Sequence, residues 1–170
     1  NEYDHYVAEL IAVPDKIVEL LDSKDIIQKI AYKQFNQPSV FFLGRGLDYA
    51  ISLEASLKLK EISYIHSEAY AAGELKHGTI ALIENNTLVV ANCTQSEVYE
   101  KTVSNIKEVK ARGAYVIGVA FESRTDAAKH MDHVILRTMS MRMRDLYETP
   151  GGPEIWLVGE TFVGAGAQGT

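Results

Sequence analysis

The sequence has only one cysteine, Cys93, so no disulfide can form within the chain. It also has no run of eighteen apolar residues and no basic segment leading into an apolar one, which predicts neither a membrane span nor a signal peptide. Basic residues are few: 17 Lys and Arg against 23 Asp and Glu give a formal net charge of −6, which leaves no basic surface for nucleic acid or an anionic membrane. Together these absences predict a cytoplasmic protein with no nucleic-acid or membrane partner.

The signatures of common metals and cofactors are missing as well. No group of His, Cys, Asp and Glu has the spacing of metal ligands, and no G-x-S-x-G marks a nucleophilic serine. The glycine pair Gly44 and Gly46 has neither the full dinucleotide spacing nor a Walker lysine. We therefore expect no metal and no cofactor. Cys93 has no evident histidine partner in the sequence and is not expected to be a catalytic thiol.

What the sequence does contain is an alternation of apolar runs with helical patterns. Its 170 residues are 46 % hydrophobic and 24 % charged, which is the composition of one globular domain. Buried strands alternating with helices predict an α/β fold with a parallel sheet and helices on both of its faces. The strands are expected at residues 39–43, 87–92, 115–121 and 133–136, and the later helices at residues 96–112 and 124–131.

The N-terminal residues have helical spacing in two parts. Residues 1–13 are interpreted as a helical lead-in, and Pro14, followed by Asp15, suits the first turn of a new helix. Ser23 and Asp25 are candidate caps for a further short helix. The main domain is therefore predicted to begin at Pro14.

A charged stripe lies in the long stretch that follows the first predicted strand. On a helical wheel of about 100° per residue, Glu54, Lys58 and Glu61 share a sector roughly 60° wide. Apolar residues flank this sector on both sides, and serines collect opposite it. If the apolar residues mark the buried face, the charged stripe points inward and the serines face water. The serines are Ser52, Ser56 and Ser63.

Two interpretations of the stripe remain open from the pattern alone. The charges either form ordinary surface pairs worth about 0.2 to 0.5 kcal/mol each, or they line a partly desolvated cleft of the kind used for acid–base catalysis. His77 follows in a loop rich in small and polar residues. A histidine suits proton transfer at neutral pH, although a single histidine is more often structural. The turn Gly44-Arg45-Gly46 either binds an anion or has its glycines only because the backbone conformation requires them.

The run from Gly44 to Thr79, GRGLDYAISLEASLKLKEISYIHSEAYAAGELKHGT, resembles the second sugar-isomerase (SIS) domain of the isomerising glutamine:fructose-6-phosphate aminotransferase family, the glucosamine-6-phosphate synthases. The segments E-x-x-x-K-L-K-E-I and E-A-Y-A-A-G-E-L-K-H-G carry the resemblance, which extends from about Pro14 to about Leu136. It implies a three-layer αβα, flavodoxin-like fold and a part in converting fructose 6-phosphate and glutamine-derived ammonia to glucosamine 6-phosphate.

The resemblance also implies roles for single residues. Glu61 would move a proton between C1 and C2 of the sugar, with Lys58 and Glu54 lining the same site. His77 would assist opening of the sugar ring from across a homodimer interface. The residues expected near the substrate, outside this catalytic set, are Gly44, Arg45 and Gly46.

The chain departs from the family pattern in three respects. It contains neither a glutaminase domain with an N-terminal cysteine nor an upstream SIS domain, so the complete protein is expected to carry both, and this chain alone is expected to be inactive. From Arg137 the sequence no longer matches the family tail, and no lysine after Lys129 can serve as the Schiff-base lysine. Residues 137–170 are therefore interpreted as an atypical segment, flexible at Gly164–Gly169 and poorly packed beyond Pro150.

Two alternative functions stay open. A non-catalytic SIS module that binds a phosphosugar and regulates a partner would share the fold, but binding alone does not need a base such as Glu61. A related SIS enzyme, either a fructosamine-phosphate deglycase or a sugar-phosphate isomerase, would share the base. The length of the A-Y-A-A-G-E-L-K-H-G match argues against it.

Overall fold

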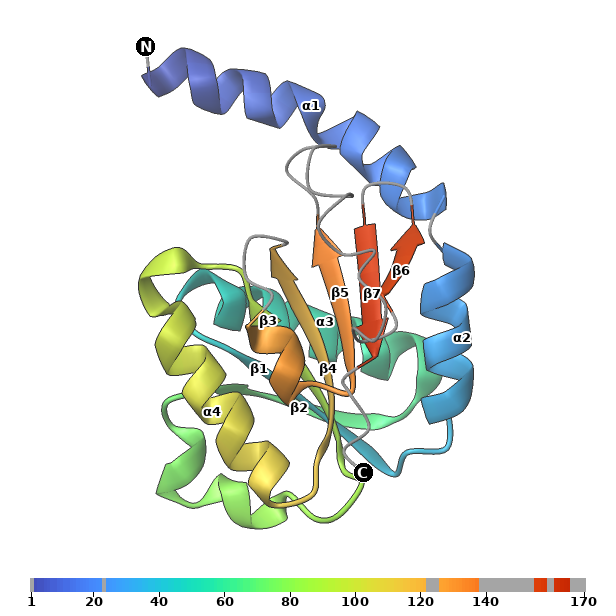
Figure 1. The fold of residues 1–170 in the computed structure, drawn as a ribbon, viewed down its shortest axis with the longest axis vertical. Coiled ribbons are helices and arrows are strands. Elements are labelled where there is room, and N and C mark those ends of the chain that lie inside the picture. Colours follow the sequence, from blue (N-terminus) through green and yellow to red (C-terminus); the bar gives the residue numbers. More distant parts are fainter. Residues whose placement is uncertain (1, 23, 122–125, 138–154, 159–160, 166–170) are drawn as a thin grey trace.

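A seven-stranded sheet forms the centre of the structure (Figure 1). The computed structural model describes residues 2–22, 24–121, 126–137, 155–158 and 161–165. The strand order is β2-β1-β3-β4-β5-β7-β6, in which β2, β1, β3, β4 and β5 run parallel and the pairs β5–β7 and β7–β6 are antiparallel. The strands are β1 (Ser39–Gly44), β2 (His66–Ala71), β3 (Leu88–Cys93), β4 (Tyr115–Phe121), β5 (His133–Arg137), β6 (Ile155–Val158) and β7 (Thr161–Ala165).

The four strands predicted from the sequence are confirmed. Strands β1, β3, β4 and β5 begin and end within one residue of the predicted bounds. Their apolar runs are buried on both faces, as in parallel sheets generally, and Val89 and Val116 have no exposed surface. Strand β2 lies outside the predicted strands: its sequence HSEAYA has no apolar run, and as an edge strand it pairs only with β1.

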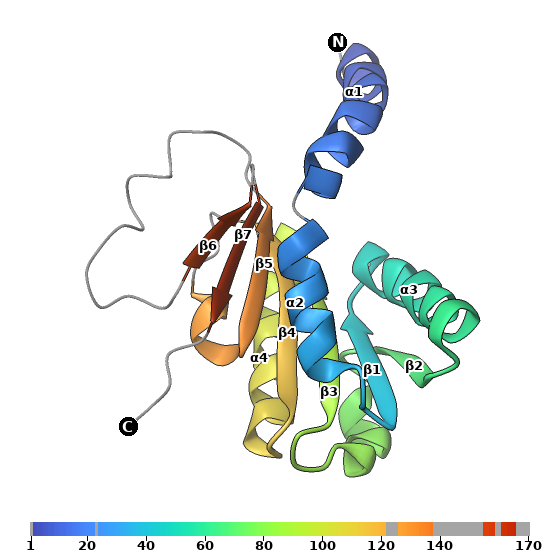
Figure 2. The ribbon, with the colours of Figure 1, turned by 90° about the vertical axis from the view of Figure 1, so that its right-hand side faces the viewer.

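Helices cover both faces of the sheet, which confirms the three-layer αβα arrangement (Figures 1 and 2). Helix α4 (Tyr99–Ala111) packs on one face through residues such as Ile106, which is fully buried. On the opposite face lie α2 (Lys24–Gln34), which buries Ile30, and α3 (Leu47–Ser63). The two faces therefore have separate apolar cores.

The later helices are shorter than predicted. The segment expected to be helical at 96–112 begins with a 3₁₀ turn at Ser96–Val98 and continues as α4. Within the segment expected at 124–131, the described residues form a single 3₁₀ turn at Ala127–His130.

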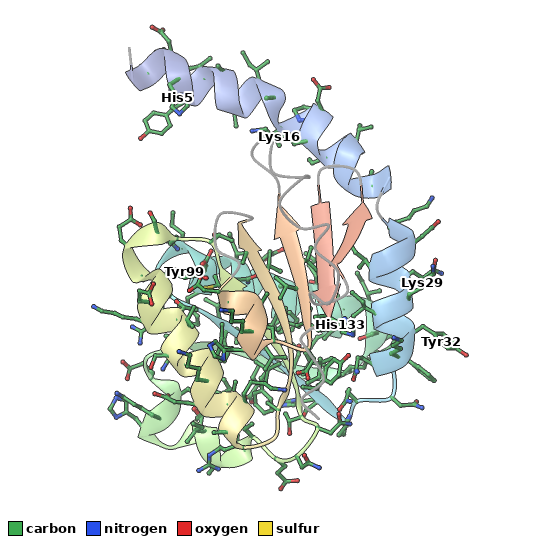
Figure 3. All side chains as sticks on the ribbon, in the orientation of Figure 1. His5, Lys16, Lys29, Tyr32, Tyr99 and His133 are labelled. Atoms are coloured by element: carbon green, nitrogen blue, oxygen red, sulfur yellow. The ribbon has the colours of Figure 1, made fainter. Side chains whose placement is uncertain are left out.

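A single helix, α1 (Glu2–Asp22), runs through Pro14 and projects beyond the sheet (Figures 1 and 2). The prediction that a new helix starts at Pro14 is therefore wrong. A proline inside a helix loses one backbone hydrogen bond, and here the helix continues past it. Figure 3 shows His5 on this helix, far from the sheet. The next helix, α2, begins at Lys24, close to the predicted caps.

The C-terminal part contains regular backbone structure. Strand β7 pairs with β5, and β6 pairs with β7, so both extend the sheet. The expected flexibility from Gly164 is wrong for Gly164 and Ala165, which lie in β7; residues 166–170 fall outside the described residues. Trp156 lies in β6, but side-chain packing beyond Pro150 falls outside the described part of the chain. The prediction of poor packing there stays a prediction.

Two histidines lie on either side of Asp132. His130 ends a 3₁₀ turn and His133 begins β5, where its ring centroid is 5.7 Å from that of Tyr115 (Figure 3). Burial lowers the pKa of both histidines below the ordinary 6.5. For His133 the charge of Lys33 lowers the pKa further and that of Asp132 opposes the change.

We predict that His133→Gln reduces the loss of stability in mild acid. Because the folded-state pKa of His133 is lowered, the unfolded chain binds its proton first. The stability that the neutral histidine maintains is fully present above the unfolded pKa and is lost as the pH falls from 6.5 toward the lower folded value. Urea unfolding at about pH 7.5 and about pH 5 measures the difference. His5→Gln on the exposed part of α1 is the control, and an equal acid loss in both variants would contradict the prediction.

Candidate active site

Helix α3 turns its serines toward the sheet. Ser52 and Ser56 are buried, whereas the side chains of Glu54, Lys58 and Glu61 are 63 %, 53 % and 49 % exposed. The prediction that the charged stripe points inward is therefore wrong. The prediction that the serines face water is wrong for the two buried ones and holds for Ser63, which is exposed at the helix end.

Hydrogen bonds make the buried serines compatible with this close packing. Ser52 Oγ donates to the carbonyl of Asp48 at 2.7 Å, and Ser56 Oγ lies 3.0 Å from Ser67 Oγ on β2. Ser67 Oγ also donates to the carbonyl of Ser56 at 2.8 Å. Small side chains bring the helix near the sheet, and their bonded hydroxyls avoid the penalty of a buried unpaired polar group. Apolar side chains on the other face are left outside.

The three charged residues of the stripe do lie together. Lys58 Nζ is 2.8 Å from Glu61 Oε2 and 3.5 Å from Glu54 Oε1. The hydrogen bond to Glu61 is the main cause of a raised pKa at Lys58, and the charges of both glutamates add to it. The ammonium group therefore stays charged between two carboxylates. In this chain alone the geometry is that of the surface pairs which the sequence left as one interpretation.

An uncovered apolar surface surrounds these charges. Ile62 and Ile51 are 79 % and 58 % exposed, and other large apolar side chains of α3 are similarly open. Several large apolar side chains exposed along one helix are typical of a surface that binds another protein surface. The other exposed residues on or beside α3 are Leu47, Leu53, Leu57 and Tyr64.

His77 lies on the other side of the sheet. It ends the 3₁₀ turn Leu75–His77, and the buried Leu75 belongs to the core beneath α4, whereas Glu61 projects from α3 on the opposite face. Glu61 is also near the end of α3 that precedes β2, while His77 follows β2, a six-residue strand that spans about 20 Å. One chain therefore does not bring His77 and Glu61 into the same site.

The turn Gly44-Arg45-Gly46 joins β1 to α3 and meets the demands of backbone geometry. A Cβ on Gly44 would lie 2.4 Å from the backbone of Asp48, and Gly46 has a φ of 56°. Arg45 directs its guanidinium to Asn105 on α4, with Nε and Nη2 donating to Oδ1 at 3.1 and 2.9 Å. Closeness of these residues to a substrate stays a prediction.

Sequence reasoning missed Asp48 and Thr94, which lie just beyond the carboxyl ends of β1 and β3. Asp48 is 1 % exposed and accepts hydrogen bonds from Thr94, which directly follows β3. An acidic residue in the first turn after a glycine turn is the signal that points to Asp48, since helix starts favour acidic residues. Cys93 is buried.

Within the described residues, no group of three or more His, Cys, Asp and Glu is placed to hold a metal ion. The same part of the chain has no helix long and apolar enough to cross a membrane.

Comparison with known proteins gives concordant results. The family model described as SIS domain matches residues 35–144. The isomerizing glutamine–fructose-6-phosphate aminotransferase of Caldanaerobacter subterraneus is 57 % identical over 129 residues, which are 76 % of this chain and 21 % of that protein. The chain spans about a fifth of the length of the curated relatives it matches.

Two solved structures are similar in both fold and sequence. The C-terminal domain of glucosamine-fructose-6-phosphate aminotransferase from Francisella tularensis has a TM-score of 0.68 and 41 % identity, over 72 % of this chain and 34 % of that one. A glucosamine-6-phosphate deaminase from Thermotoga maritima has a TM-score of 0.50 and 34 % identity, over 59 % of this chain and 30 % of that one.

We predict that Ser56→Leu destabilises the domain by about 1–3 kcal/mol, because the larger side chain overpacks the contact between α3 and β2. It also removes the hydroxyl that lies beside Ser67. Ser104→Leu, at an exposed position of α4, is the control and is expected to cost much less. Urea denaturation of both variants gives the comparison. Equal stability of the two would mean that α3 does not pack on the sheet through its serines.

Proposed function

The chain belongs to the SIS-domain family, and we propose that it is the C-terminal isomerase domain of a glutamine–fructose-6-phosphate aminotransferase. The complete protein would convert fructose 6-phosphate and glutamine-derived ammonia to glucosamine 6-phosphate. One observation carries the proposal: a lysine held between two carboxylates, Glu54 and Glu61, lies in the middle of an uncovered apolar surface on α3.

The proton transfer requires one group that takes a proton from one sugar carbon and returns it to the next. Glu61 supplies the carboxylate for this step. Lys58, 2.8 Å away, pairs with that carboxylate and would offer positive charge to an enediol-like intermediate. Glu54 keeps Lys58 charged from the other side. A second surface covering α3 would exclude water and strengthen all three interactions.

A second copy of the chain supplies His77 in this proposal. The sheet separates His77 from Glu61 within one chain, which supports a site built by two copies. In a homodimer with twofold symmetry, the surface bearing His77 in one copy would meet the α3 surface of the other, and this would occur twice. The histidine would then assist opening of the sugar ring.

The remaining parts of the enzyme would come from outside this chain. Because the chain spans about a fifth of its relatives, we propose that an upstream SIS domain and a glutaminase domain complete the protein. The proposed setting is the cytoplasm, where the sugar phosphate is available. Without those domains, the 170-residue chain alone would be inactive. Its main domain is proposed at residues 14–136, with an atypical segment at 137–170.

The second candidate is release of ammonia from glucosamine 6-phosphate. It is favoured by the 34 % identity to the Thermotoga maritima deaminase. The same base, Glu61, would serve because the C1/C2 proton transfer runs in either direction. If the complete protein released ammonia from glucosamine 6-phosphate and made no glucosamine 6-phosphate from fructose 6-phosphate and glutamine, this candidate would be selected. The 57 % identity to an aminotransferase favours the first.

We predict that Glu61→Gln lowers the isomerisation rate of the complete protein by about 10²- to 10⁴-fold, the usual contribution of a general base. The melting temperature is expected to stay unchanged, because this side chain lies outside the core. Glu100→Gln, an exposed change of the same type on α4, is the control. Retained isomerisation in Glu61→Gln would remove Glu61 from the mechanism and favour a module that only binds sugar phosphate.

A mixing experiment tests the two-copy site. Glu61→Gln and His77→Asn are each expected to be inactive, and random reassociation of the two variants would restore about a quarter of the normal activity, since half of the dimers contain one intact site of two. The measurement is activity after the variants are dissociated and reassociated together. No recovery, with hybrid dimers present, would place both residues in a single copy.

A further inference from the structure

The carboxyl ends of β1 and β3 form the place where an α/β sheet of this topology is expected to bind ligands. From β1 the chain continues to β2 on one side, whereas β3, β4 and β5 follow on the other side of β1. The strand order thus reverses between β1 and β3, and open α/β sheets bind ligands in the crevice beyond such a reversal. Two loops border this crevice, Gly44–Gly46 after β1 and Thr94–Gln95 after β3.

A carboxylate of the chain itself occupies this position. Asp48 lies in the first turn of α3, and its side chain is buried, with 1 % of its surface exposed. Its Oδ2 accepts the backbone N–H of Thr94 at 2.8 Å, and its Oδ1 accepts the hydroxyl of Thr94 at 2.5 Å. A loop N–H and a hydroxyl beside a helix start are donors of the kind that bind a phosphate oxygen. Here they bind an internal carboxylate.

The other half of the crevice is filled as well. Gln95 Nε2 donates to the carbonyl of Arg45 at 2.9 Å, and its Oε1 lies 2.9 Å from where a Cβ on Gly46 would be. The Gln95 side chain therefore covers the turn after β1. Because Gly46 has no side chain, there is room for the Gln95 side chain.

The cation of the turn is directed away from the crevice. Arg45 binds Asn105, a buried residue of α4, with two hydrogen bonds. Its guanidinium also packs against Gly73: a Cβ at that position would lie 2.8 Å from Nη2 of Arg45. Asn105 in turn donates to Glu108 Oε2 at 3.1 Å, which fixes the orientation of its amide. Arg45 thus connects the turn to α4 and does not offer its charge to a ligand between β1 and β3.

We propose that Asp48 acts as a built-in anion that closes this crevice to phosphate-containing ligands. A phosphate brought to Thr94 would compete with Asp48 for the same donors and would meet its negative charge at close range, where like charges repel strongly. The turn Gly44-Arg45-Gly46 then serves to hold α3 in place.

The first measurement uses the unaltered 170-residue chain and inorganic phosphate. Amide resonances in ¹H–¹⁵N spectra are followed as phosphate is added, and then again with fructose 6-phosphate. We expect no saturable shift at Gly46, Thr94, Gln95 or Ser96. A saturable shift at these amides would overturn the proposal. The readout involves no catalysis, so this result is independent of whether Glu61 acts as a base.

The second measurement opens the crevice. Asp48→Ser removes the carboxylate and frees the donors of Thr94, and saturable phosphate binding at the same amides is expected to appear. Glu84→Ser, an exposed change of equal charge near the start of β3, is the control for net charge. A folded Asp48→Ser chain that binds phosphate no better than Glu84→Ser would overturn the proposal.

A third variant keeps the test decisive if Asp48→Ser does not fold. Gln95→Ala removes the partly exposed amide over Gly46 and leaves Asp48 in place. Because the carboxylate still blocks the donors of Thr94, no phosphate binding is expected. Saturable binding at Thr94 in this variant would show that Asp48 does not exclude anions.

Discussion

The contact between α3 and the sheet determines how this domain presents its charged residues. Ser52 and Ser56 lie against the strands, and the hydroxyl pair of Ser56 and Ser67 fixes the helix on β2. Rotating the helix by half a turn would bury the charged stripe, and buried charges are costly unless fully paired. The packing of small hydroxylated side chains therefore places Lys58 and its two glutamates on the outside. An apolar surface surrounds them there because the same rotation leaves it uncovered.

Much of this architecture is readable from the sequence, since β1, β3, β4 and β5 are apolar runs that two helical layers must cover. The sequence does not reveal which face of α3 packs on the sheet, because a helical wheel assumes that apolar residues face the chain's own core. That assumption fails at Ile51 and Ile62, which are exposed here. Strand β2 is missed because an edge strand of a parallel sheet needs no apolar run. Helix α1 is divided in two by the prediction because the sequence does not show that a helix continues past Pro14. Nor does sequence spacing reveal Asp48, whose partner is forty-six positions away.

Under the proposed function, the charged groups of this domain form a complete site only when another surface covers them. The acid and its lysine lie over one face of the sheet, His77 lies on the other, and Asp48 fills the crevice at the strand ends. Each feature has its own structural cause: serine packing, the return of the chain after β2, and an acidic first turn. Under the proposed function, the fold would supply proton-transfer residues and other parts of the assembly would supply the enclosure.

If a second protein surface covers the outer face of α3 in the complete enzyme, as proposed, Lys58 must lose its accessibility there. An amine-reactive label, quantified by mass spectrometry, is applied to the 170-residue chain and to the complete protein, with the exposed Lys107 of α4 as the internal reference. We expect Lys58 to be labelled readily in the isolated chain and several-fold more slowly in the complete protein, relative to Lys107. Equal relative labelling of Lys58 in both would contradict it.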